Sequence, residues 1–151
     1  MVKQSWDNYF MDIAHTVKKR SSCLTRQVGA VIVLDKRIIA TGYNGTPMGL
    51  KNCNEGGCPR CVARMRGEIK PGTDLDKCTC CHAEENAIVQ SALHGISTKG
   101  ATAYITLTTC TQCAKMLINA GIRRVVSEQP YPDDLGTQML KEVGIELDIF
   151  T

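Results

Sequence analysis

CCHAEENAI, residues 80–88, is the stretch that organises this chain, and CTQC, residues 110–113, is its counterpart. Apolar residues recur at helical intervals after His82, and a second run with the same period begins at Cys110. Each motif therefore predicts the start of a helix. The partial positive charge at a helix N-terminus favours anionic thiolates, so Cys110 and Cys113 are well placed to act as ligands. We expect the two helix starts to face one metal ion.

His82, Cys110 and Cys113 offer one imidazole and two thiolates, a donor set that suits tetrahedral zinc. Three protein ligands leave a fourth position open for water, which predicts a reactive metal site. Glu84 lies about 200° from His82 around an ideal helix, so it can face that open position instead of binding the metal. A carboxylate there can remove the proton of a zinc-bound water and later deliver protons to a substrate. A structural zinc site or buried cysteines would leave Glu84 without a role.

The spacing of these motifs has a known chemical meaning. HxE followed by PCxxC is the signature of zinc nucleobase deaminases, in which the glutamate is a general acid and base and not a ligand. Here HAE at residues 82–84 and CTQC match it, with one departure, because Thr109 stands in the proline position. Proline presets the backbone that enters the helix, and a threonine hydroxyl can cap the helix in its place. We therefore expect the metal site to be kept.

Composition describes one ordinary domain. A chain of 151 residues with 43% hydrophobic and 22% charged residues is long enough to bury its own core. The net charge of +3 hints at an anionic substrate, but the basic runs of a nucleic-acid binder are missing. No apolar stretch approaches a membrane span and no signal-peptide core follows Met1, so we expect a cytoplasmic protein. Without an export signal, the nine cysteines favour metal binding over disulfides.

The hydrophobic pattern alternates between helix and strand periods. Strands and helices in alternation imply a three-layer α/β/α sandwich around a mixed sheet of about five strands. The predicted helices cover Ser5 to about Arg20, the segment after His82, the segment from Cys110 to Gly121, and a face from Leu135 to Val143. The predicted strands cover 28–34, 37–41 after an Asp35-Lys36 turn, 103–107, 125–126 and 145–150.

A cysteine-rich insertion, residues 45–81, has few apolar residues, and a loop that long needs something to hold it. CPRC at 58–61 and CTC at 78–80 have the short spacings of a structural zinc site, separate from the catalytic one. Spacing alone does not define the ligands, and free thiols on a flexible loop are the alternative. The pool for structural zinc is Cys23, Cys53, Cys58, Cys61, Cys78 and Cys80.

Six motifs spread over nearly the whole chain together resemble the deoxycytidylate deaminases of the cytidine deaminase-like superfamily. They are RSSC (20–23), RQVGAVIV (26–33), GYNG (42–45), HAEENAI (82–88), CTQCAK (110–115) and INAGIRRVV (118–126). The resemblance implies a single catalytic domain over residues 1–151 that converts dCMP to dUMP for thymidylate synthesis with a catalytic zinc ion. It also implies a homohexamer that dCTP activates and dTTP inhibits, with Mg²⁺ accompanying the triphosphate.

The resemblance also assigns roles to single positions. His82, Cys110 and Cys113 match the family's zinc ligands, and Glu84 matches its proton shuttle. The substrate contacts implied are Asn44 at the sugar, Arg26 and Tyr131 at the phosphate, and Ala83 within the HAE motif. The family's structural-zinc positions match Cys23, Cys53 and residues just before HAE, so a choice of four ligands and a two-metal cluster both stay open.

The GYNG segment resembles the family's site for the regulatory triphosphate, which assigns Gly42, Tyr43, Asn44 and Gly45 to it. Glycines let backbone N–H groups approach phosphates closely, and Lys51 could add charge. A plain turn needs the same glycines.

Two other classes of function share part of this pattern. A deaminase acting on bases in tRNA or single-stranded nucleic acid would share HxE and CxxC, but it should show a basic channel and aromatic stacking platforms. With 5% aromatic residues this chain does not show them. A non-enzymatic zinc-stabilised interaction module would give Glu84 no purpose.

Overall fold

Five strands form one sheet in the computed structural model, which describes residues 1–151. The strands are β1 (Gly29–Leu34), β2 (Arg37–Tyr43), β3 (Thr102–Ile105), β4 (Arg124–Ser127) and β5 (Glu146–Ile149). Their order across the sheet is β2-β1-β3-β4-β5. β1 is antiparallel to β2 and β3, whereas β3, β4 and β5 run parallel. The prediction of a mixed five-stranded sheet is confirmed.

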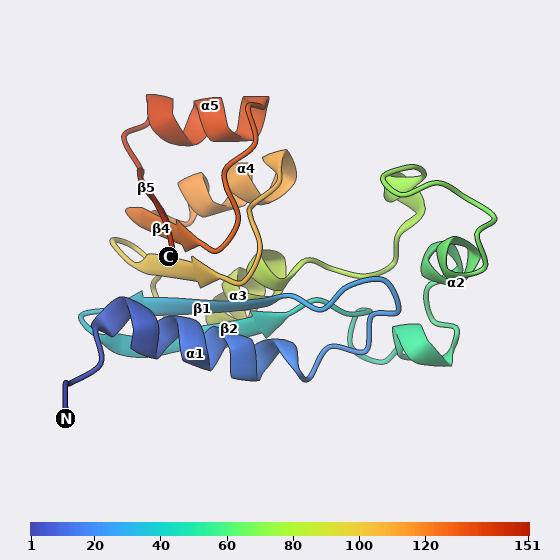
Figure 1. Ribbon diagram of the computed structural model, residues 1–151, viewed down its shortest axis with the longest axis horizontal. Helices are drawn as coiled ribbons and strands as arrows, with labels where there is room; N and C mark the ends of the chain where they lie inside the picture. Colours follow the sequence, from blue (N-terminus) through green and yellow to red (C-terminus); the bar gives the residue numbers. More distant parts are fainter.

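Helices cover both faces of this sheet (Figure 1). They are α1 (Trp6–Lys18), α2 (Pro59–Met65), α3 (Ala83–Leu93), α4 (Thr111–Asn119) and α5 (Leu135–Glu142), with 3₁₀ turns η1 (Cys53–Glu55) and η2 (Leu75–Lys77). Side chains alternate along β1, because successive strand residues point to opposite faces. Val31 and Val33 pack in one cluster with Phe10 of α1, while Ile32 packs in the other cluster with Leu117 of α4. The three-layer sandwich is thereby confirmed.

Local sequence explains where the first elements begin and end. The Ser5 hydroxyl accepts the Asn8 N–H at 3.1 Å, so Ser5 caps α1 as predicted. The helix ends two residues earlier than predicted, at Lys18. Asp35 and Lys36 both adopt positive φ angles, 50° and 62°, which is the backbone of a tight two-residue hairpin turn.

β2 runs two residues further than predicted, so Gly42 and Tyr43 belong to the strand and not to a loop after it. Gly42 pairs with Ala30 of β1. A Cβ atom on Gly42 would lie 2.2 Å from the Ala83 carbonyl oxygen and 2.4 Å from the Ala87 nitrogen. The missing side chain therefore lets the first turns of α3 lie directly on β2.

The cysteine-rich insertion extends beyond one end of the sheet and carries α2 (Figure 1). The sequence did not predict α2, because seven residues are too few to show a helical period. Pro59 at its first position and Cys58 as its N-cap nevertheless define its start. No helix in the protein combines the length and the apolar character that a membrane span requires.

Candidate active site

Two helix N-termini meet at the candidate site, as the sequence predicted. His82 is the N-cap of α3, and Cys110 is the N-cap of α4. The Cys110 sulfur accepts the Cys113 N–H at 3.5 Å, so it occupies the place of a capping oxygen. The Glu85 carboxylate accepts the His82 N–H at 3.2 Å and closes the capping box of α3. Both helix starts are therefore held by their own first turns.

The three predicted ligands converge. Nδ1 of His82 lies 3.3 Å from the Cys113 sulfur and 3.4 Å from the Cys110 sulfur. All three potential ligand atoms lie within 4.8 Å of one another. One imidazole nitrogen and two sulfurs facing a common point fit a zinc ion and leave room for a further ligand. The geometry identifies Nδ1 as the nitrogen that would bind.

The three candidate ligands shift one another's pKa values. A hydrogen bond from the Cys113 thiol is the main cause that lowers the pKa of Cys110 to about 4. A hydrogen bond with Cys110 raises the pKa of His82 to about 9, and contact with Cys110 also raises the pKa of Cys113. A divalent cation would take the place of the protons on His82 and Cys113, because metal ligands must be deprotonated.

Glu84 lies in the first turn of α3 and is only 4% exposed. This burial raises the pKa of its carboxyl group. The Thr109 hydroxyl donates a hydrogen bond to Glu84 Oε2 at 3.2 Å. The expectation that Thr109 caps α4 is wrong, because Cys110 is the N-cap and Thr109 precedes it. Its hydroxyl is instead turned toward the carboxylate.

A cleft of about 900 Å³ opens beside these groups. His82 and Glu84 line it together with three of the predicted substrate residues, Ala83, Arg26 and Asn44. Ala83 is fully buried at the start of α3, whereas Arg26 is exposed at the cleft wall. The structure thus brings a cationic side chain and two of the candidate metal ligands, His82 and Cys110, to one cavity.

Asn44 holds the cleft wall in shape. Its Oδ1 accepts the Val28 N–H at 2.8 Å, and its Nδ2 donates to the Arg26 carbonyl at 2.8 Å. The side chain therefore ties the end of β2 to the segment that carries Arg26. One amide N–H is left over for a ligand, and the predicted contact with a sugar stays a prediction.

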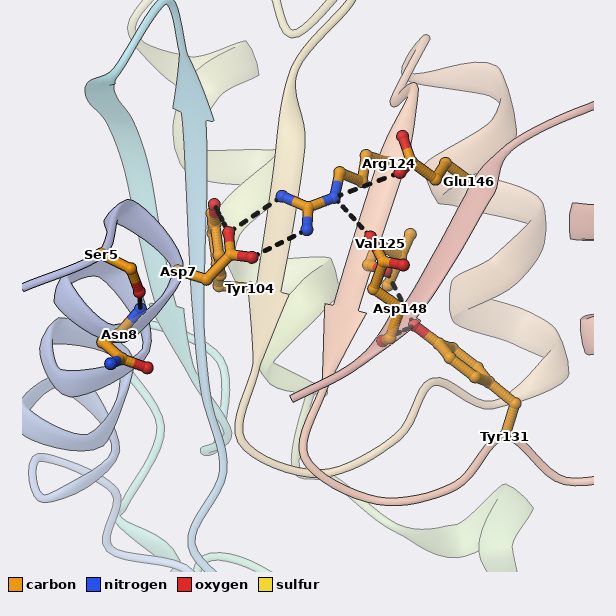
Figure 2. A network of polar contacts seen from close by, with 9 residues as sticks. All are labelled: Ser5, Asp7, Asn8, Tyr104, Arg124, Val125, Tyr131, Glu146 and Asp148. Carbon is orange, nitrogen blue, oxygen red and sulfur yellow. Dashed lines mark hydrogen bonds and ion pairs between the residues drawn. The ribbon is translucent and has the colours of Figure 1, made fainter. Parts of the chain in front are cut away.

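Tyr131 does not line the cleft. Its hydroxyl lies 2.9 Å from the Val125 carbonyl oxygen and 3.0 Å from the Asp148 carbonyl oxygen (Figure 2). A hydroxyl has one proton to donate, so these two backbone groups share it. This placement gives the predicted phosphate contact no support. The prediction rested on the resemblance at a single position, which does not show that the hydroxyl bonds to backbone carbonyl groups.

The GYNG segment has structural roles that the sequence left open. The Gly45 N–H donates to the Cys81 carbonyl at 3.1 Å, and the Cys81 N–H donates back at 2.8 Å. Gly42 is paired within the sheet and packed under α3. The N–H of Gly45 and the pairing of Gly42 are therefore used within the fold, and the assignment of this segment to a regulatory triphosphate stays a prediction. Tyr43 is partly exposed and its carbonyl accepts the Asn86 side chain.

All six cysteines of the predicted structural pool lie together, and none forms a disulfide. Their sulfurs fall into two overlapping groups. One group is Cys23, Cys53, Cys61 and Cys80, and the other is Cys58, Cys61, Cys78 and Cys80. The insertion is thus organised around sulfur atoms, which form a small core of their own.

Several cleft residues escaped the sequence analysis, among them Arg60, Arg64 and Thr108. Arg60 is 8% exposed and its Nε donates to the Thr73 carbonyl at 3.0 Å. The spacing of CPRC predicts metal binding by its two cysteines and carries no signal for the arginine between them. The Thr108 hydroxyl is buried without a hydrogen-bond partner. No sequence pattern distinguishes it from its neighbour Thr109.

Comparison with known proteins agrees with this geometry. Residues 4–129 match the family described as the cytidine and deoxycytidylate deaminase zinc-binding region. Deoxycytidylate deaminase of Schizosaccharomyces pombe is 42% identical over 146 residues, which cover 96% of this chain and 44% of the relative. The chain therefore spans less than half the length of that relative. Deoxycytidylate deaminase of Mycobacterium phage D29 is 38% identical over 83% of this chain and 96% of its own length.

Among solved structures, one similar fold is that of a dCMP deaminase from the cyanophage S-TIM5 in complex with dCMP and dUMP. The TM-score is 0.78 and the sequence identity is 29%. The match covers 99% of this chain and 100% of the phage protein.

Proposed function

Since the chain belongs to the family of cytidine and deoxycytidylate deaminases with a zinc-binding region, we propose that it hydrolyses dCMP to dUMP and ammonia. The observation that carries the proposal is the convergence of His82, Cys110 and Cys113 at the edge of a cleft that Glu84 also lines. A relative with the name deoxycytidylate deaminase is matched over 96% of its length. The phage dCMP deaminase of similar fold binds dCMP and dUMP in its crystal structure.

Nδ1 of His82 and the sulfurs of Cys110 and Cys113 would hold the zinc ion. When bound there, zinc supplies Lewis acidity that lowers the pKa of a coordinated water to about 7. The placement of both ligand-bearing segments at helix N-termini favours the thiolate form of the cysteines.

Glu84 would carry the protons of the reaction. Its carboxylate accepts a proton from the attacking water, whose oxygen forms a bond to C4 of the cytosine ring. Glu84 delivers this proton to N3, accepts the second proton from the same oxygen, and passes it to the amino group as the C4–N bond breaks, so that water and dCMP yield dUMP and ammonia. Thr109 holds Oε2, which leaves Oε1 as the oxygen that moves the proton.

The same proposal extends to recognition of the substrate and to regulation. Arg26 is an exposed cation of the cleft, suited to a 5′-phosphate, and Asn44 keeps one N–H for the sugar. We propose that residues 1–151 act as one catalytic domain whose insertion binds zinc. The homohexamer, activation by dCTP and inhibition by dTTP with Mg²⁺ are proposed from the family resemblance alone.

Ammonia release tests the proposal. The purified chain is incubated separately with dCMP, CMP, deoxycytidine and a tRNA pool. We expect release from dCMP well above that from the other three. Release from the tRNA pool alone would instead assign the chain to the nucleic-acid deaminases, and release from none would leave the zinc-stabilised binding module.

A further inference from the structure

Five sulfurs of the cysteine-rich insertion, together with the sulfur of Cys23, form two sets of four that share two members. Within each set every sulfur lies within 4.8 Å of the others. Cys61 and Cys80 belong to both sets, Cys23 and Cys53 only to the first. Both sets are present in the same structure, so they are not alternative arrangements of one site.

The sulfurs of each set lie close enough together to share one zinc ion. A zinc–sulfur distance of about 2.3 Å places the sulfurs of a regular tetrahedron about 3.8 Å apart. The sulfurs of Cys58 and Cys78 lie 3.8 Å apart. Two tetrahedra that share an edge need six thiolates, and six are present.

We propose that these cysteines bind two zinc ions in one cluster, with Cys61 and Cys80 each bridging both ions. Cys23 and Cys53 complete the first site, and Cys58 and Cys78 complete the second. The inference does not depend on the proposed reaction, because no atom of the cluster belongs to the His82 site.

Three of the four terminal cysteines have an N–H or hydroxyl hydrogen-bond partner at sulfur. The Leu24 N–H donates to Cys53 at 3.4 Å, the Thr79 N–H donates to Cys58 at 3.4 Å, and the Thr25 hydroxyl lies 3.4 Å from Cys23. No N–H or hydroxyl group bonds to the bridging Cys61 or Cys80, nor to the terminal Cys78, whose sulfur lies 3.8 Å from that of Cys58. A sulfur shared by two metal ions has its lone pairs occupied, so it has less need of such donors than a terminal thiolate.

A single ion would leave two cysteines unused in either arrangement. An ion in the first set leaves Cys58, and an ion in the second leaves Cys53, and both residues are 0% exposed. A buried thiol that binds no metal contributes no ligand, although it lies among thiolates. With a second ion, all six cysteines act as ligands.

The cluster also connects the insertion to the cleft. Cys23 lies three residues before Arg26, and Cys80 lies two residues before His82. Two zinc ions at this point would anchor the segment that carries Arg26 and the segment that begins α3. Four of the six cysteines, Cys23, Cys61, Cys78 and Cys80, also line the cleft. The proposed cluster is therefore a structural support at the wall of the candidate site, although it shares no ligand with the His82 site.

Zinc content of the purified full chain, prepared without chelators, tests the count. We expect three zinc ions per chain in the wild type and two in Cys110→Ser, which lacks only the ion of the His82 site. Cys80→Ser or Cys61→Ser should lose both cluster ions, whereas Cys58→Ser should lose about one. Counting in the Cys110→Ser background keeps the result separate from any failure of the proposed catalytic site. One zinc ion in that background, or iron with acid-labile sulfide, would overturn the cluster.

Substitution of a bridging cysteine can prevent folding, so cadmium NMR of the intact chain gives a second measurement. In protein loaded with ¹¹³Cd, the β-protons of Cys61 and Cys80 should couple to two cadmium resonances each. The other four cysteines should couple to one. If every cysteine couples to a single cadmium ion, the bridging assignment is wrong.

Discussion

The Thr109 hydroxyl donates a hydrogen bond of 3.2 Å to the Glu84 carboxylate, and the two side chains are 2% and 4% exposed. This contact joins the residue before the α4 cap to the first turn of α3. In the zinc nucleobase deaminase signature a proline occupies the position of Thr109 and has no hydroxyl to donate. This chain therefore holds its candidate proton carrier with a bond that the signature does not provide.

Loss of this bond should slow the reaction without removing metal. A hydrogen bond to a charged group contributes about 1.5–3 kcal/mol, so we expect Thr109→Val to lower kcat by about tenfold or more. Thr137→Val is the matched control, because the buried Thr137 hydroxyl has no partner to lose. Zinc content and kcat for dCMP are measured on both variants. An unchanged kcat in Thr109→Val would mean that the bond does not position Glu84.

Glu84→Gln should abolish most turnover while the ligands stay in place. Glutamine keeps the shape of the side chain but cannot accept and return a proton, and general acid–base catalysis contributes about 10²–10⁴-fold. We expect at least that loss in kcat with zinc content equal to the wild type. Glu142→Gln, at the exposed end of α5, controls for the change in charge. Near-normal turnover in zinc-loaded Glu84→Gln would remove the residue from the mechanism.

The two glycines of GYNG should respond differently to alanine. In Gly42→Ala the new Cβ would meet backbone atoms of α3 at 2.2 Å and 2.4 Å, so the helix that carries Glu84 must move. Such overpacking costs about 1–3 kcal/mol of unfolding free energy. In Gly45→Ala the nearest atom lies 4.0 Å away, so stability should be unchanged. Chemical denaturation of both variants compares them directly, and equal stability would contradict the packing argument.

The Arg124 network should make stability depend on pH at the acidic end. Arg124 donates to both carboxylate oxygens of Asp7 at 2.9 Å, and its Nε donates to Asp148 at 2.6 Å (Figure 2). The hydrogen bond from Arg124 holds the pKa of Asp7 below its ordinary value. A carboxyl whose folded pKa is depressed stabilises the protein above its unfolded pKa, and this contribution is lost as pH falls through the folded value.

Asp7→Asn should therefore lower the unfolding free energy at pH 7 by about 1 kcal/mol, since the pair is partly exposed. The difference from the wild type should shrink as pH falls below about 4. Asp133→Asn, at an exposed position outside any ion pair, is the control. A difference that stays constant from pH 7 to acid would show that the carboxylate charge is not what matters.

Regulation by triphosphates is open to a kinetic test. Feedback requires that dCTP and dTTP prefer different states of an oligomer, because equal affinity for both states shifts nothing. We expect sigmoidal dependence of rate on dCMP, which dCTP with Mg²⁺ makes hyperbolic and dTTP suppresses. If the rate depends hyperbolically on dCMP concentration and neither nucleotide changes the curve, the GYNG segment has only the packing role described above.

Sequence periodicity was enough for the architecture. The alternation of β-branched runs with helical runs predicted the sheet and its layers, because burial on one face imposes a fixed period on each element. Boundaries were less accurate. β2 continues through Gly42 and Tyr43 because strand pairing with β1 and the close approach of α3 outweigh the local turn preference of Asn-Gly.

By itself the sequence determined the chemistry of the candidate site, since ligand types and their spacing at helix starts depend on local structure alone. Only the tertiary structure decided what depends on residues far apart in the chain. In the folded chain the Thr109 hydroxyl donates to Glu84 and the Tyr131 hydroxyl donates to backbone carbonyls. The Gly45 N–H donates to the Cys81 carbonyl. The tertiary structure also divided six cysteines into two sets that share Cys61 and Cys80. Sequence spacing constrains only residues that are neighbours along the chain. Whether two sites share a ligand depends on distances between segments that folding brings together.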